Sequence, residues 1–266
     1  MDNSSTPRNE RLVLALVAAR EAGHITLEYF QTDRYRVERK GDNSPVTEAD
    51  RAAEQHLRGL IGRAFSDDAI LGEEFGQSPG VSGYRWILDP IDGTKSFISG
   101  VPLYGTLVGL ERDGQPLAGV IHIPALGETV WGALGGGAWH QQGNADPVPA
   151  RVSTATSLGE SLFCTSEVRT FDERGRRAAY DRLQDAARLS RTWGDCYGYL
   201  LVATGRAELM VDPALNVWDA AALLPILEEA GGAFTDWQGR RTIHSSEGIG
   251  ACPGVLAEVL AITRGA

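Results

Sequence analysis

Residues 86–94 read Trp-Ile-Leu-Asp-Pro-Ile-Asp-Gly-Thr and join an apolar run to a turn with two carboxylates. The apolar residues 86–88 predict a short buried strand that ends at Asp89. Pro90 restricts the backbone of the turn, and Gly93 lets a ligand approach the main chain. Thr94 would then begin a short helix, whose free N–H groups attract an anion. The stretch therefore predicts a site for hard cations and phosphate at the end of a strand.

Two acidic residues elsewhere in the chain can complete such a site. Glu73 follows a strand expected at residues 69–71, and Asp219 opens a helix expected over residues 219–230. Magnesium prefers oxygen ligands and is usually held by a few carboxylates together with substrate phosphate. Two metals ~3.5–4 Å apart can hold the attacking and leaving oxygens of an in-line displacement. The pattern therefore favours metal-assisted phosphate chemistry.

Each acidic residue also has a structural interpretation, which the sequence leaves open. Asp50 has the spacing of a helix capping box with a preceding threonine. Asp92 and Asp219 could each cap a helix, and Glu73 could belong to a solvated charge pair. Asp89 fits such a role poorly, because an unpaired carboxylate that closes an apolar strand is costly. Structural roles alone do not explain why acidic, glycine and hydroxyl residues gather at four element ends.

The composition excludes other classes of function. The 266 residues include 25 basic and 35 acidic side chains, and the formal net charge of −10 opposes nucleic acid and anionic membranes as partners. The three cysteines form no CxxC pair, the five histidines lack metal-ligand spacing, and no GxxxxGK[ST] loop is present. The polar start and the lack of an apolar run of ~20 residues predict a soluble, cytoplasmic protein.

Helical and strand patterns alternate along the chain, which predicts layers of helix and sheet. Asp113-Gly114 predicts a hairpin over residues 105–123, and Gly135-Gly136-Gly137 predicts another over residues 129–141. A helix is expected over residues 171–187.

We expect a flexible N-terminal tail at residues 1–10 and a single domain over residues 11–266. A polar, proline-containing segment near residues 144–152 would divide this domain into two packed halves, about 11–150 and about 151–266. The first half carries most of the candidate metal ligands.

Four segments together resemble the inositol monophosphatase-like family of magnesium-dependent phosphatases: Gly72-Glu73-Glu74, residues 86–94, Trp218-Asp219-Ala220-Ala221 and Glu229-Ala230-Gly231-Gly232. The resemblance extends from about Leu12 to about Leu260. It implies a five-layered αβαβα sandwich, two or three Mg²⁺ ions in each active site, and a homodimer. The metal ligands that it implies are Glu73, Asp89, the carbonyl of Ile91, Asp92 and Asp219.

The resemblance also assigns roles in catalysis and substrate binding. It implies that Asp50 and Thr94 orient the nucleophilic water, and that the Gly93-Thr94 backbone holds the phosphate. Lys40 resembles a basic residue that helps to attract phosphate in some members of the family. The residues predicted to contact phosphate or substrate are Asp92, Gly93, Thr94, Lys95, Arg191, Asp195, Asp212 and Asp219.

The second half resembles the bacterial histidinol-phosphatase branch of the family, through residues 194–197, 201–205, 212–213 and 216–219. Inositol phosphatases tend to have a small residue in place of Asp195 and a glutamate in place of Asp212. Two carboxylates near the leaving group suit the ammonium and imidazole of histidinol. Asp195 could instead cap the helix that begins at Tyr197.

These features predict a magnesium-dependent phosphomonoesterase that hydrolyses histidinol phosphate in histidine biosynthesis. The alternative is an inositol monophosphatase or a phosphatase of broad specificity for sugar phosphates. A non-catalytic protein that kept the fold would be expected to lack a ligand, whereas every predicted ligand and water-orienting position holds a competent residue.

Overall fold

The structure is a computed structural model of the chain, and it describes residues 5–33, 36–39 and 45–265. Its helices are α1 (Ser5–Leu27), α2 (Glu48–Ala64), α3 (Thr94–Ile98), α4 (Val168–Glu173), α5 (Arg177–Ala186), α6 (Cys196–Ala203), α7 (Val217–Ala220), α8 (Leu223–Glu229) and α9 (Pro253–Thr263). Helix α1 begins at Ser5 and therefore inside the segment that we expected to be a flexible tail.

The first half supplies the strands β1 (Val37–Arg39), β2 (Pro45–Thr47), β3 (Ala69–Gly72), β4 (Gly76–Ser78), β5 (Tyr84–Asp92), β6 (Gly105–Arg112), β7 (Gln115–Ile123), β8 (Glu128–Ala133), β9 (Gly137–Gln142) and β10 (Val148–Pro149). The second half supplies β11 (Leu162–Cys164), β12 (Leu189–Arg191), β13 (Leu209–Asp212), β14 (Ala233–Thr235) and β15 (Gly248–Ala251).

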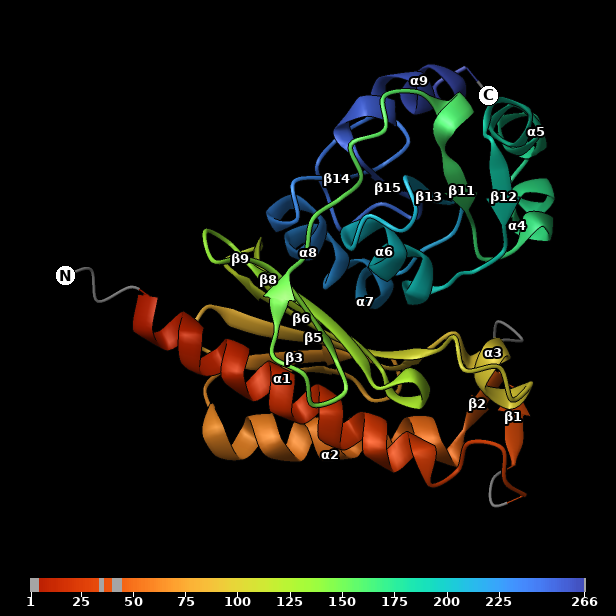
Figure 1. The fold of residues 1–266 in the computed structure, drawn as a ribbon. Helices are drawn as coiled ribbons and strands as arrows, with labels where there is room; N and C mark the ends of the chain where they lie inside the picture. Colours follow the sequence, from red (N-terminus) through yellow and green to blue (C-terminus); the bar gives the residue numbers. More distant parts are fainter. Residues whose placement is uncertain (1–4, 34–35, 40–44, 266) are drawn as a thin grey trace.

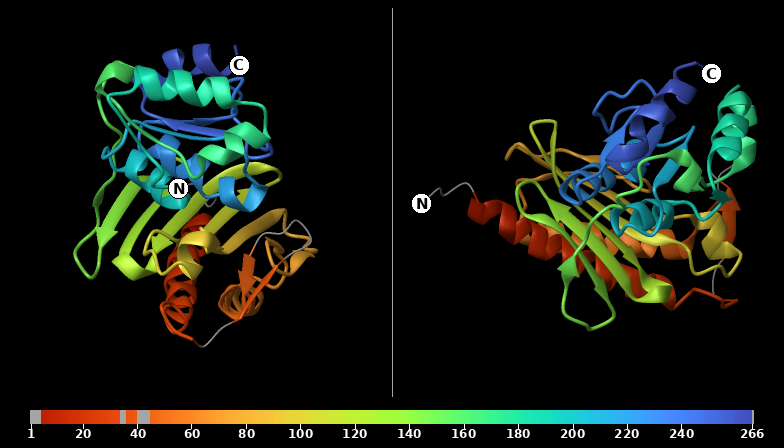
Figure 2. Two further views of the ribbon diagram at one scale, coloured as in Figure 1. Left: turned by 90° about the vertical axis from the view of Figure 1, so that its right-hand side faces the viewer. Right: turned by 45° about the horizontal axis from the view of Figure 1, so that its top comes forward.

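The elements stack in five layers, which confirms the predicted αβαβα sandwich. Figure 1 shows α1 and α2 beneath the larger sheet and α6, α7 and α8 between the two sheets. Helices α4, α5 and α9 cover the outer face of the smaller sheet, where Phe171, Leu183 and Val255 share one apolar cluster with its strands. Figure 2 shows the same order of layers from two other sides.

The two sheets differ in topology. The larger sheet has the order β10-β9-β8-β7-β6-β5-β3-β4, and its neighbouring strands are antiparallel except for the parallel pair β3 and β5. The smaller sheet has the order β12-β11-β13-β15-β14, in which β11 is parallel to both β12 and β13. The hairpins expected at residues 105–123 and 129–141 are confirmed as β6–β7 and β8–β9.

Strand β5 continues beyond Asp89, where we expected it to end, and reaches Asp92. Asp89 pairs with Leu107 and Asp92 pairs with Gly105, so β5 contains one more residue than β6 between these pairs. Residues three apart on a regular strand point to opposite faces, and the extra residue of a bulge removes this alternation. The bulge at Pro90 and Ile91 therefore lets both carboxylates face the same side of the sheet.

Three glycines make room for the middle layer of helices. Gly109, Gly119 and Gly132 are neighbours across β6, β7 and β8. A Cβ atom on Gly119 would lie 2.1 Å from the carbonyl oxygen of Ala222, which joins α7 to α8. A Cβ on Gly109 would lie 2.6 Å from the Cβ of Ala221. The glycine row thus lets the α7–α8 connection rest directly on the sheet backbone, which fixes α7 beside β5.

Two helices that we expected to be continuous are each divided. The helix expected over residues 171–187 is interrupted at Gly175, whose φ of 67° ends α4 before α5 begins. The helix expected over residues 219–230 consists of α7 and α8. Asp219 is therefore the third residue of α7 and does not open the helix, as its N-cap is Asn216. Among the described residues, no helix is both long enough and apolar enough to cross a bilayer.

Candidate active site

A cavity of about 520 Å³ lies where β3, β5 and α3 of the first half meet α4, α6 and α7 of the second. Its described lining includes one basic residue, Lys95, and seven acidic ones: Glu73, Asp89, Asp92, Glu167, Asp195, Asp212 and Asp219. Such an excess of carboxylates repels a phosphate ester unless cations neutralise part of it.

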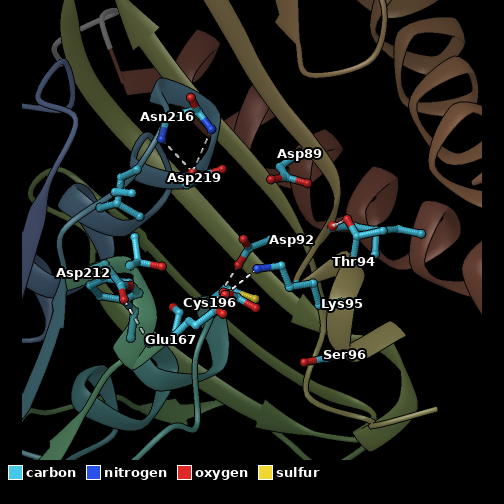
Figure 3. Close-up of a pocket in the computed structure, with 18 of the residues that line it drawn as sticks. Asp89, Asp92, Thr94, Lys95, Ser96, Glu167, Cys196, Asp212, Asn216 and Asp219 are labelled. Atoms are coloured by element: carbon cyan, nitrogen blue, oxygen red, sulfur yellow. Dashed lines mark hydrogen bonds and ion pairs between the residues drawn. The ribbon is translucent and has the colours of Figure 1, made fainter. Parts of the chain in front are cut away.

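Three of these carboxylates form a compact cluster. One oxygen from each of Asp89, Asp92 and Asp219 lies within 4.8 Å of the other two, and Figure 3 shows the three side chains converging on one space. Asp89 is 2% exposed, and its Oδ1 accepts no hydrogen bond from the described residues. A buried, unpaired carboxylate oxygen is costly to fold, so this donor set fits a hard cation.

The ionisation of the cluster reflects the same crowding. Burial and the nearby negative charges raise the pKa of Asp89 and of Asp92 well above the ordinary value for aspartate. Burial also raises the pKa of Asp219 to about 7. Carboxylates that resist ionisation together become fully charged when a cation replaces their protons.

Asp219 belongs to this cluster and also takes part in capping a helix, which is the structural role left open by the sequence. The backbone N–H of Asn216 donates to Oδ2 of Asp219 at 2.6 Å, and the two residues form a capping box at the start of α7. Asp92 is fixed in a similar way, because the backbone N–H of Cys196 at the start of α6 donates to its Oδ2 at 2.5 Å. Both side chains are thus oriented by helix starts in the second half.

Asp50 is not among the described residues that line the cavity, and it forms a capping box at the start of α2. The N–H and hydroxyl of Thr47 donate to its Oδ2 at 2.7 and 2.6 Å, which fixes Asp50 at the start of α2. Its Oδ1 is buried and has no hydrogen-bond partner among the described residues. Burial raises the pKa of Asp50 to about 6, and the negative charge of Glu73 adds to this effect. Asp50 therefore has one oxygen available for another donor.

Glu73 lines the cavity at the end of β3. Its backbone N–H donates to the carbonyl of Leu88 at 3.2 Å, which places it beside the strand that carries Asp89. The expected convergence of Glu73, Asp89, Asp92 and Asp219 on one cavity is thus present in the fold.

The turn at Gly93 and Thr94 forms another wall of the cavity. Gly93 has a φ of 87°, and a Cβ atom on it would lie 2.9 Å from Oδ2 of Asp195 and 3.3 Å from the carbonyl of Leu103. The hydroxyl of Thr94 donates to the carbonyl of Ile91 at 3.1 Å. The side chain of Lys95 forms an ion pair with Glu167 across the cavity (Figure 3).

Two predicted substrate residues of the second half, Asp195 and Asp212, line the cavity in different environments. Asp195 is half-buried, lines the cavity and makes no capping hydrogen bond, although it is the N-cap of α6. Burial raises its pKa above the ordinary value. Asp212 also lines the cavity but is 2% exposed. Its Oδ1 accepts from the N–H of Ser166 at 2.9 Å, and its Oδ2 accepts from the hydroxyl of Tyr199 at 3.1 Å.

The structure does not bring Arg191 to the cavity. Arg191 ends the edge strand β12, is exposed, and packs its guanidinium over the ring of Trp193, 5.8 Å from the centroid. Lys40 lies outside the described residues.

Sequence reasoning missed the cavity residues Ser166, Glu167 and Thr170, which lie at and just before α4. They carry no motif, and only the packing of the two halves brings them opposite Lys95.

Comparison with known proteins agrees with this geometry. Residues 8–265 match the inositol monophosphatase family. A histidinol-phosphatase of Chlorobaculum parvum is 46% identical over 90% of both chains, and one of Mycobacterium tuberculosis is 38% identical over 91% of this chain and 93% of its own. The solved inositol monophosphatase of Zymomonas mobilis matches with a TM-score of 0.83 at 32% identity, over 96% of this chain and 98% of its own. The chain therefore belongs to the inositol monophosphatase family and is a phosphoric monoester hydrolase.

Proposed function

We propose that this protein hydrolyses histidinol phosphate to histidinol and phosphate as a step of histidine biosynthesis. The observation that carries the proposal is the position of Asp195, whose carboxylate lies against the Gly93 turn and outside the compact cluster of Asp89, Asp92 and Asp219. A carboxylate beside the phosphate turn favours a leaving group with a positive charge, and histidinol carries an ammonium. The similarity to histidinol-phosphatases supports the same assignment.

The residues that would hold Mg²⁺, two or three ions in each site, are Glu73, Asp89, the carbonyl of Ile91, Asp92 and Asp219. The donor set is entirely oxygen, and the buried Oδ1 of Asp89 lacks a partner, which fits this ion. When bound, magnesium supplies positive charge that attracts the phosphate and stabilises the oxygens that become negative in the reaction.

Asp50 and Thr94 orient the attacking water in this proposal. Since the hydroxyl proton of Thr94 is directed at the carbonyl of Ile91, its lone pairs can accept a hydrogen bond from water. The unpaired Oδ1 of Asp50 can accept a second one. The backbone of Gly93 and Thr94, with the nearby ammonium of Lys95, binds the phosphoryl oxygens.

Asp195 makes the direct contact with the ammonium of histidinol. Asp212 contributes mainly through its negative charge, since its two oxygens already accept hydrogen bonds from Ser166 and Tyr199. Inositol is neutral and offers only hydroxyl groups, so it gains less from these carboxylates.

The other features of the proposal concern the whole protein. We propose a cytoplasmic homodimer, in which residues 11–266 form a single domain of two packed halves. An apolar cluster shared by residues of both halves, such as Ile121 and Leu224, supports their folding as one unit.

A phosphate-release screen in the presence of Mg²⁺ tests the substrate. Histidinol phosphate, inositol 1-phosphate and fructose 1,6-bisphosphate are compared at equal concentration, and kcat/KM is measured for each. We expect the highest kcat/KM with histidinol phosphate. A higher value with inositol 1-phosphate would instead assign the protein to the inositol monophosphatases.

A further inference from the structure

Glu54 is an acidic residue of α2 that is completely buried and lies outside the lining of the cavity. Its carboxylate faces the backbone of the turn that follows β3. Oε2 accepts a hydrogen bond from the backbone N–H of Glu74 at 2.7 Å, and Oε1 accepts one from the N–H of Phe75 at 3.2 Å. Glu54 therefore holds the backbone of the two residues that follow Glu73.

Arg58 completes this contact one helical turn later. Its Nε donates to Oε1 of Glu54 at 2.8 Å, and its guanidinium also donates to the hydroxyl of Ser78 at 3.0 Å and to the carbonyl of Gly76. Glu54 thus binds the N–H donors of the turn from β3 into β4, and Arg58 binds its hydroxyl and carbonyl acceptors. The side chain of Arg58 is 15% exposed, whereas that of Glu54 is fully buried.

Gly72 shows how closely the carboxylate approaches this turn. A Cβ atom at Gly72 would lie 2.0 Å from Oε1 of Glu54, so a larger residue at this position would displace the carboxylate. Glu73 is next in the chain, and its own N–H is bound to the carbonyl of Leu88. Contacts with Glu54 therefore restrict the backbone on both sides of Glu73, at Gly72 and at Glu74.

Helix α2 carries Asp50, Glu54 and Arg58 at intervals of four residues, which places them on one face. The proposed water-orienting residue and the support of the Glu73 turn are thus parts of one helix. A shift of the turn relative to α2 would change the position of Glu73 relative to Asp50.

We propose that Glu54 is a positioning residue that holds Glu73 in place for magnesium, an inference that rests on the proposed function. A metal ligand must be held close to its productive position by groups with fixed conformations. Without the carboxylate of Glu54, two N–H groups lose their acceptor and Arg58 loses its counter-ion. The turn then relaxes, and Glu73 no longer meets the other ligands in the geometry that Mg²⁺ requires.

The test is the variant Glu54→Gln, which keeps the volume of the side chain, replaces one of its two acceptor oxygens by an NH₂ group, and removes the charge that pairs with Arg58. Calorimetry with Mg²⁺ alone and the Mg²⁺ dependence of phosphate release are measured on the same preparation. We expect Mg²⁺ to bind about 10–100-fold more weakly, the usual effect of losing a group that orients a metal ligand. The kcat should recover largely at saturating Mg²⁺.

Glu111→Gln is the matched control. Glu111 of β6 is also a buried glutamate paired with an arginine, and its Oε1 lies 2.6 Å from Nη2 of Arg85. Arg85 is near the start of β5, whereas Asp89 and Asp92 are near its end. Its loss should lower thermal stability without changing Mg²⁺ affinity. A general effect of removing a buried charge would weaken Mg²⁺ binding in both variants, which would contradict a specific role for Glu54.

The outcomes separate this inference from the proposed function. If the wild-type protein neither binds Mg²⁺ nor is activated by it, the proposed function fails. If the wild type binds Mg²⁺ and Glu54→Gln binds it equally well, the positioning role is overturned. Should Glu54→Gln not fold, Arg58→Gln takes its place: Mg²⁺ affinity reduced several-fold would support the role, and unchanged affinity would overturn it.

Discussion

Three aspartates of the site each use one carboxylate oxygen to hold a backbone N–H at the start of a helix. Asp50 accepts from Thr47, Asp92 from Cys196 and Asp219 from Asn216, in each case through Oδ2. A carboxylate has several lone pairs, so the same side chain can also accept a donor or bind a cation. Capping and chemistry are therefore compatible roles for one residue, and the capping geometry fixes the side chain for the second role.

Substitution of the two residues proposed to orient water separates these roles. Thr94→Ala should lower kcat about 100-fold or more with little change in KM, because the water loses one of its acceptors. Thr94→Ser keeps the hydroxyl and should retain most of the activity. Asp50→Asn should also lower kcat strongly while the helix start stays intact, since the amide oxygen of asparagine can still accept hydrogen bonds from the N–H and hydroxyl of Thr47. A kcat near the wild-type value in Asp50→Asn would leave Asp50 with only its capping role.

Substitution of Asp195 and Asp212, two carboxylates of the second half that line the cavity, tests the choice of substrate. A charge-assisted hydrogen bond contributes about 1.5–3 kcal/mol. Asp195→Asn should therefore reduce kcat/KM for histidinol phosphate about ten- to a hundred-fold and alter hydrolysis of p-nitrophenyl phosphate much less. Asp212→Asn should act in the same direction, and it should also destabilise the fold because its hydrogen bonds with Ser166 and Tyr199 are disturbed. Equal losses on both substrates would show that these carboxylates serve the fold or the metal site.

At the scale of elements, the glycine row of the larger sheet determines where α7 lies. Gly119→Ala places a methyl group 2.1 Å from the carbonyl of Ala222, so the α7–α8 connection must move away from the sheet. We expect a loss of about 1–3 kcal/mol in the free energy of unfolding and reduced activity, because Asp219 moves with α7. Denaturant titration and kcat/KM measure the two effects.

Gly62→Ala is the control for this substitution. Gly62 is exposed within α2, and a Cβ atom there meets nothing within 4 Å. This change should raise the free energy of unfolding by up to about 1 kcal/mol, because alanine favours helix more than glycine does. An equally stable Gly119→Ala would show that the connection does not rest on the sheet as described.

Helix α1 packs against β7 at His122, which predicts a dependence of stability on pH. A Cβ atom on Gly23 would lie 2.6 Å from the His122 ring, and burial lowers the pKa of this imidazole to about 4. Between this value and the ordinary pKa of about 6.5, the unfolded chain binds the extra proton and the folded chain does not. Stability should therefore fall as the pH decreases from about 6.5 to about 4.

The variant His122→Gln isolates this contribution. The pKa values of Asp50 and Asp212 are raised to about 6, which favours the folded state at low pH, but both residues are the same in the two proteins. The wild type should lose more thermal stability than the variant over this pH range. Parallel curves for the two proteins would contradict a neutral, buried His122.

At the scale of the whole molecule, local signals in the sequence predicted much of the fold. Asp113-Gly114 gave the β6–β7 hairpin, and the capping box of Asp50 gave the start of α2. The β5 bulge and the position of Asp219 within α7 were not predicted, since both depend on contacts between elements. The support of the Glu73 turn by Glu54 depends on the packing of α2, so no local pattern could reveal it.

The site itself is formed only when the two halves are packed together. Asp219 comes from the second half, and Asp89 and Asp92 come from the first. Because the apolar cluster between the sheets contains residues of both halves, removal of metal should leave the fold assembled while the carboxylates share protons. Metal binding then stabilises the folded chain by an amount that grows with the logarithm of the metal concentration divided by its dissociation constant.

The carboxylate cluster is proposed to bind magnesium, and the most direct test of this proposal is calorimetric titration of Mg²⁺ into the EDTA-treated, dialysed protein. Asp89→Asn is titrated for comparison, and phosphate release is measured on both proteins. The wild type should bind Mg²⁺ and regain activity from a level near zero. Asp89→Asn should remain folded, with thermal stability in EDTA at least equal to that of the wild type because the crowded cluster contains one ionisable carboxyl group fewer. It should bind Mg²⁺ weakly and stay inactive. Full activity of the wild type in EDTA, or of Asp89→Asn with Mg²⁺, would contradict the account.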